Sequence, residues 1–246
     1  MSHRSTCLAS FLFTMGLYTS YTRLKIRSRS PSNHPLVHSG IFVLGGPGAG
    51  KRTLCARLAA SANLDKTKVH HLSVDELLRS AREKGGQVGH IINNCILSDH
   101  NVPSSVIMEL LKEVIIDACS DGECSGVKRV FLMDGFPRYM ENISVWDGEI
   151  ATRRLDVHVR CIVFLECPEE LCTARLLGQG ATSGHLDNDF ETIRKRFRSF
   201  REEIYPVMSL FESGIRNDGV VVKKVLADRP MDMVYQDFLN VLQNFL

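Results

Sequence analysis

The fold is decided by one stretch, Gly45-Gly46-Pro47-Gly48-Ala49-Gly50-Lys51-Arg52-Thr53, which joins the apolar run 41–44 to a helical pattern that begins near Thr53. This order is typical of a strand, a glycine loop and a helix. Glycine fills four of the six positions before the lysine, so successive backbone N–H groups can turn inward without obstruction from Cβ. The positive end of the following helix adds to this anion nest. The stretch therefore predicts a polyphosphate site.

The residue after the lysine departs from the general phosphate-loop pattern, G-x-x-x-x-G-K-[S/T], in which a hydroxyl helps to hold Mg²⁺. Here Arg52 follows Lys51, and Thr53 comes one place later. If Arg52 faces the metal position, its guanidinium repels the metal. If it points outward, its backbone N–H can still serve the nest. Glycines alone would also fit a plain tight turn, but the lysine at this spacing favours phosphate binding.

Composition places the chain among ordinary globular proteins. Its 246 residues are 44% hydrophobic, enough for one full core with a small additional subdomain. A formal charge of +2 without interleaved aromatic and basic residues argues against a nucleic-acid binder. The eight cysteines include no C-x-x-C pair, which favours a reducing compartment and argues against a zinc site.

Residues 1–40 differ from the rest because they contain no Asp or Glu and carry five Arg or Lys residues. An apolar stretch at 7–18 is shorter than the ~20 residues that a membrane span needs. We expect an extension that is a disordered tail, a mitochondrial presequence or the apolar part of a secretory signal. The expected location is cytoplasmic, with the mitochondrion as the alternative.

The remainder, 41–246, alternates apolar runs with helical patterns. Strands are predicted at 41–44, 70–73, 130–133, 160–166 and 220–226, and helices at 53–62, 87–97, 104–118, from 168, after 189 and from 231. Residues 178–189 are polar and contain glycines, so we expect an exposed loop there. The adjacent histidines at 70 and 71 should point to opposite faces of their strand. The pattern predicts an α/β fold: three layers, α/β/α, around a five-stranded parallel sheet.

Ligands bind such folds beyond the carboxyl ends of the strands. The phosphate loop, Asp134 and Arg138 all follow predicted strands there. A lysine, a carboxylate and an arginine at one edge are suited to phosphoryl transfer, since they neutralise developing charge and hold metal-bound water.

Four motifs resemble those of the adenylate kinase family, in the same order. They are Gly-Gly-Pro-Gly-Ala-Gly-Lys (45–51), Leu-Leu-Arg (77–79), Asp-Gly-Phe-Pro-Arg (134–138) and Thr-Ser-Gly-x-x-Asp (182–187). The resemblance covers about 41–245 and is strongest to the short-lid members, the cytosolic adenylate kinases and UMP/CMP kinases. It implies transfer of a phosphate from Mg-ATP to a nucleoside monophosphate, a helical monophosphate-binding part at about 73–103 and a short lid at about 178–190.

The resemblance also implies roles for individual residues. Catalysis is assigned to Lys51, Asp134, Arg138 and Arg196, with Mg²⁺ held through water and phosphates near Asp134 rather than by a direct protein ligand. ATP binding is assigned to Gly46, Gly48, Ala49, Gly50, Lys51, Arg52, Thr53 and Arg175. Monophosphate binding is assigned to Val74, Arg79, Val102, Arg138, Asn142, Asp187 and Arg196.

Three positions depart from the family. Gly is usual where Arg52 stands, and Arg is usual where Gln179 and His185 stand in the lid. Fewer lid cations imply weaker stabilisation of the transition state, since such arginines contribute about 10³–10⁵ in rate. Two functions therefore stand: a nucleoside monophosphate kinase of reduced rate, and a nucleotide-binding pseudoenzyme with an interaction role.

The sequence leaves two choices for the acceptor nucleotide: UMP or CMP on the one hand, and AMP on the other. Asn142 and Trp146 resemble UMP/CMP kinases and favour the pyrimidine nucleotides. We expect a monomer whose partners are nucleotides, with neither nucleic acid nor stable membrane insertion.

Overall fold

A parallel sheet forms the centre of the computed structural model, which describes residues 38–61, 63–64, 67–120, 127–152, 155–183, 189–216 and 218–246. Its strands are β1 (His38–Gly45), β2 (Asn63–Leu64), β3 (Thr67–Ser73), β4 (Lys128–Asp134), β5 (Val157–Glu166) and β6 (Val221–Leu226). They lie in the order β2-β3-β4-β1-β5-β6. Strands β3, β4, β1, β5 and β6 are mutually parallel, which confirms the predicted five-stranded parallel sheet. The two-residue β2, antiparallel to β3, adds an edge that was not predicted.

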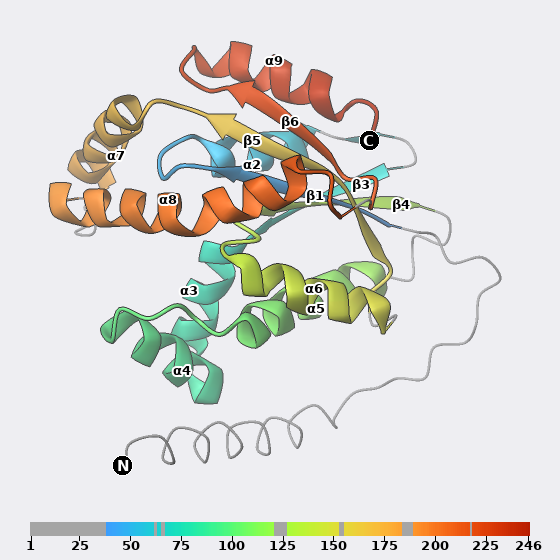
Figure 1. Ribbon diagram of the computed structural model, residues 1–246, viewed down its shortest axis with the longest axis horizontal. Coiled ribbons are helices and arrows are strands. Elements are labelled where there is room, and N and C mark those ends of the chain that lie inside the picture. Colours follow the sequence, from blue (N-terminus) through green and yellow to red (C-terminus); the bar gives the residue numbers. More distant parts are fainter. Residues whose placement is uncertain are drawn as a thin grey trace. The chain divides into compact units, whose positions relative to one another are not determined.

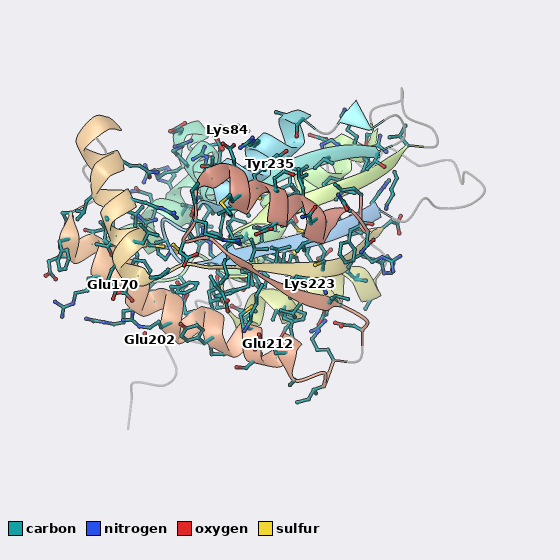
Figure 2. All side chains as sticks on the ribbon, turned by 90° about the horizontal axis from the view of Figure 1, so that it is seen from above. Lys84, Glu170, Glu202, Glu212, Lys223 and Tyr235 are labelled. Carbon is teal, nitrogen blue, oxygen red and sulfur yellow. The ribbon has the colours of Figure 1, made fainter. Side chains whose placement is uncertain are left out.

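Helices cover both faces of this sheet (Figure 1). They are α2 (Lys51–Ser61), α3 (Val74–Lys84), α4 (Gly86–Leu97), α5 (Ser104–Ser120), α6 (Met140–Ala151), α7 (Glu169–Ser183), α8 (Phe190–Glu212) and α9 (Met231–Leu242). Figure 2 shows Glu212 at the end of α8 and Lys223 on the edge strand β6; the next residue of that strand, Lys224, forms an ion pair of 3.2 Å with Glu212. Among the described residues, no helix is both long and apolar enough to cross a membrane.

Alternation along the central strand divides the core in two. Phe42 and Leu44 face a cluster built with α3, α4, α5, α6 and the second half of α8. Ile41 and Val43 face a second cluster built with α2, α7, α9 and the first half of α8. Since successive side chains of a strand point to opposite faces, a strand buried on both sides needs a continuous apolar run. This explains the composition of 41–44.

The loop predicted at 178–189 is wrong in its first half, because α7 continues to Ser183. Two glycines lie in this last part, but each lowers helix stability by only about 1 kcal/mol relative to alanine. Burial of Cys172 and Leu176 anchors the preceding turns, so the helix can continue past them. Residues 184–188, the rest of the predicted loop, lie outside the described residues.

Two further differences concern the start of β1 and the presence of helix α6. β1 begins at His38, three residues before the predicted strand, and both His38 and Ser39 are buried in the sheet. Helix α6 was not predicted at all. Its signal was present, since Ile143, Trp146 and Ile150 recur at helical spacing and the first two are buried.

Candidate active site

The phosphate loop runs from the end of β1 to the first turn of α2. Gly48 has φ +79°, and a Cβ there would lie 2.7 Å from the carbonyl oxygen of Cys172 on α7. The amide of Ala49 donates to the oxygen of Gly46 at 3.2 Å, which closes the turn before α2 starts. Only glycine combines this backbone conformation with so close an approach. The geometry of the loop is thus fixed by packing against α7.

Lys51 folds back over the loop. Its Nζ donates hydrogen bonds to the carbonyl oxygens of Gly45 at 2.8 Å and Gly46 at 3.0 Å. Burial lowers the pKa of Lys51, with Arg138 and Arg196 acting in the same direction and Asp134 opposing. Asp134, Arg138 and Arg196 therefore lie within electrostatic range of Lys51.

Asp134 ends β4 and is only 6% exposed. Nε2 of His71, from the neighbouring strand β3, lies 3.4 Å from its Oδ2. His70 points the other way and stacks on Phe131, with ring centroids 5.2 Å apart, which confirms that the two histidines face opposite sides. His71 and Ser73 are two residues apart on β3, so they lie on the same face of the strand, and Ser73 pairs with Asp134 in the sheet. The alternation of β3 was thus the sequence signal for His71.

The carboxylate of Asp134 is a candidate for holding magnesium. Within the parts of the chain that the structure describes, no three His, Cys, Asp or Glu side chains gather into a metal-binding group. Mg²⁺ commonly keeps several waters and is held by one or two carboxylates together with substrate phosphates. A single buried Asp134 beside the phosphate loop suits that mode of binding.

Arg138 is held in place from two directions. Its guanidinium forms an ion pair with Asp75 on the first turn of α3 and donates to the oxygen of Gly135 at 3.3 Å. Its backbone N–H donates to Oδ1 of Asn142 at 2.8 Å. Asn142 is 1% exposed and donates from Nδ2 to Oγ of Ser104 at 2.9 Å. Asn142 thus links the α6 end of the site to α5.

Arg52 points outward, which decides between the two orientations considered for it. Its Nη2 lies 2.6 Å from Oε2 of Glu76, on the first turn of α3. The other oxygen of the same carboxylate accepts a hydrogen bond from Nη2 of Arg79 at 3.1 Å. Neither Asp75 nor Glu76 was predicted as a site residue. Their partners Arg138 and Arg52 lie far away in the sequence, so these ion pairs follow only from the folded structure.

On the far side of the loop, Arg175 of α7 lies across the end of the sheet. Its Nη2 donates to the carbonyl oxygen of Ala227 at 3.0 Å, and Nη1 lies 3.5 Å from Sγ of Cys167. These contacts place a flat guanidinium between α7 and the segment after β6. Thr53 lies exposed in the first turn of α2.

A cavity of about 610 Å³ lies beside the loop rather than over its charged residues. It opens between α8 and the carboxyl ends of β5 and β6, and Gly46 forms part of its wall. Phe164 and Phe200 stack there with centroids 6.3 Å apart. Neither Lys51 nor Asp134 lines it, so the candidate site is defined by its charges and not by this cavity.

The remaining residues that the sequence singled out are either held against the protein interior, exposed, or outside the described residues. Val74 is buried at the start of α3, and the carbonyl of Val102 accepts a hydrogen bond from the hydroxyl of Tyr139. Arg196 and Gln179 are exposed on α8 and α7. His185 and Asp187 lie outside the described residues.

The chain is similar to known proteins over most of its length. Residues 43–215 match the family model described as adenylate kinase. The chain is 36% identical to uridylate kinase of Saccharomyces cerevisiae over 217 residues, covering 88% of this chain and 96% of that protein. It is 34% identical to UMP-CMP kinase 2 of Caenorhabditis elegans over 207 residues, covering 83% and 96%. It is 33% identical to UMP-CMP kinase of Homo sapiens over 208 residues, covering 84% and 96%. The chain belongs to the adenylate kinase family.

Proposed function

We propose that this protein is an ATP-dependent nucleoside monophosphate kinase that transfers the γ-phosphate of Mg-ATP to UMP or CMP. The observation that carries the proposal is that the phosphate loop with Lys51 and the segment from Asp134 to Arg138 follow the paired strands β1 and β4, with Arg196 of α8 near enough to lower the pKa of Lys51. Phosphoryl transfer needs cations around the moving group and a carboxylate for the metal, with little covalent chemistry from the protein. These residues supply both.

Each part of the site then has its own task. The N–H groups of the loop and Lys51 hold the β and γ phosphates of ATP, and Arg175 stacks against its base. Arg79 and Arg138 bind the phosphate of the acceptor, and Arg196 lies between the two phosphates. Mg²⁺, when bound, supplies further positive charge beside Asp134 through its waters. Together these groups supply the positive charge that phosphoryl transfer needs.

UMP and CMP are proposed ahead of AMP for two reasons. The relatives compared above carry the names uridylate kinase and UMP-CMP kinase. Asn142, which resembles the UMP/CMP kinases, is buried and holds the backbone N–H of Arg138, so it acts on the acceptor through that arginine.

One observation favours a second function, that of a nucleotide-binding pseudoenzyme. Gln179, where an arginine is usual, lies exposed on α7 and brings no positive charge to the lid. A protein with this loop and these arginines would still bind nucleotides, yet its transition state would lack a cation.

A coupled assay of ADP formation tests the proposal with UMP, CMP and AMP as acceptors. We expect turnover with UMP or CMP, and loss of ATP binding without loss of fold in Lys51→Ala, because that variant removes charge and opens no core cavity. Lys223→Ala, an exposed lysine on β6, is the matched control and should behave as wild type. Turnover at background with ATP binding intact would favour the pseudoenzyme. A tenfold preference for AMP would overturn the choice of acceptor.

A further inference from the structure

The first turn of α3 carries two carboxylates that lie among the arginines of the site. Glu76 is shared: one oxygen accepts from Arg52 at 2.6 Å, and the other accepts from Arg79 at 3.1 Å. The first partner comes from α2 and the phosphate loop, and the second from the turn that follows Glu76. All three side chains are about half exposed, so the group is accessible to solvent and to a ligand.

Sharing matters because Glu76 and an incoming phosphate compete for the same guanidinium. A phosphate dianion that draws Arg79 toward itself takes it away from Glu76. Without a second partner, the carboxylate would then face the anionic ligand unneutralised, and like charges at close range repel. The shorter contact with Arg52 leaves Glu76 neutralised when Arg79 turns to the ligand.

We propose that Arg52 is a positioning residue for the acceptor: by holding Glu76, it frees Arg79 to bind the monophosphate and screens Glu76 from it. This inference rests on the proposed function and extends it, since it gives a role in acceptor binding to a residue of the ATP-binding loop. The proposed role gives a reason for an arginine at position 52, where the side chain pairs with Glu76 and does not face the metal position.

The inference predicts a particular pattern of kinetic change. Arg52→Ala raises the KM and the Kd for UMP by about three- to fivefold, the size expected for an exposed ion pair. The fold-change in KM exceeds that in kcat and that in the Kd for ATP, because the pair acts on the acceptor side. Arg52→Lys restores most of the affinity, since it retains the charge.

A double-mutant cycle with Glu76→Gln distinguishes this role from a structural one. Once Glu76 is neutral, Arg79 is no longer held, so removing Arg52 has little further effect on UMP affinity. Arg57→Ala is the matched control: Arg57 lies on the same helix and forms an exposed ion pair of 2.7 Å with Asp232, away from α3. It should leave UMP affinity unchanged.

Calorimetric binding of UMP, CMP and AMP to the full chain is measured alongside turnover. Equal losses from Arg52→Ala with and without Glu76→Gln would overturn the inference, as would a loss confined to ATP affinity. Wild-type protein that binds a monophosphate without turning it over would end the kinase proposal and leave the binding cycle as the test of Arg52. Protein that binds none of the three would overturn both.

Discussion

The two regions proposed to bind phosphate, the ATP side and the monophosphate side, are built in different ways. On the ATP side, the loop presents backbone groups whose geometry is fixed by glycines packed against α7. On the monophosphate side, Arg79 and Arg138 are side chains that pair with Glu76 and Asp75 on one exposed turn of α3. The first region is preorganised, so its ligand meets donors already in place. The second must exchange one anion for another when its ligand arrives.

The largest effect should come from adding a side chain to the rigid region. Gly48→Val introduces a Cβ that would lie 2.7 Å from the carbonyl oxygen of Cys172, at a φ of +79° that valine rarely adopts. The loop must move, and we expect ATP affinity to fall by about 100-fold or more, since strain of ~1–3 kcal/mol adds to the loss of aligned donors. Calorimetry with ATP measures this.

Gly148→Ala provides the control for that substitution. Gly148 lies in α6 with open space around its Cα, so alanine should stabilise the fold by about 0.5–1 kcal/mol and leave ATP affinity unchanged. Gly48→Val with normal ATP affinity would show that the loop adapts and that the two regions do not differ in rigidity.

The next effect concerns positive charge in the lid, which neither region supplies. Gln179→Arg together with His185→Arg should raise kcat at least tenfold, equivalent to ~1.4 kcal/mol of barrier, with little change in monophosphate KM. Arg52 is left in place, because its guanidinium already lies against Glu76. Gln179→Lys with His185→Lys supplies charge without the planar fork and should give a smaller gain. An unchanged kcat would mean that lid charge does not limit the rate.

The sequence predicted the phosphate loop more fully than the side-chain pairs on α3, and the reason is physical. Glycines, a lysine and the flanking strand and helix are consecutive, so the loop follows from local rules. The pairing of Arg52 with Glu76 joins residues 24 positions apart and depends on side-chain rotamers. The extent of α7 was missed for a related reason: anchoring by buried Leu176 outweighed the local cost of glycine.

The smallest effect tests the exchange of anions on α3 directly. Asp75→Asn removes the carboxylate that pairs with Arg138, so we expect the Kd for UMP to fall two- to fivefold as that arginine becomes available. The same variant should lose stability. Removal of water by the side chains around it would raise the pKa of Asp75, but the neighbouring Arg138, and then Lys51 and Arg196, hold it below its ordinary 3.8.

A lowered pKa means that the folded protein binds this proton less readily than the unfolded chain. The stabilisation is therefore fully present above about pH 4 and is lost as the pH falls through the folded-state pKa. Because 73% of the Asp75 side chain is exposed, we expect a few tenths of a kcal/mol at pH 7. Urea unfolding of wild type and Asp75→Asn at pH 7 and pH 3 measures the difference, which should shrink at the lower pH and vanish in an Arg138→Gln background. If UMP affinity is unchanged while stability falls, Asp75 serves only to hold Arg138, and the monophosphate side is as preorganised as the loop.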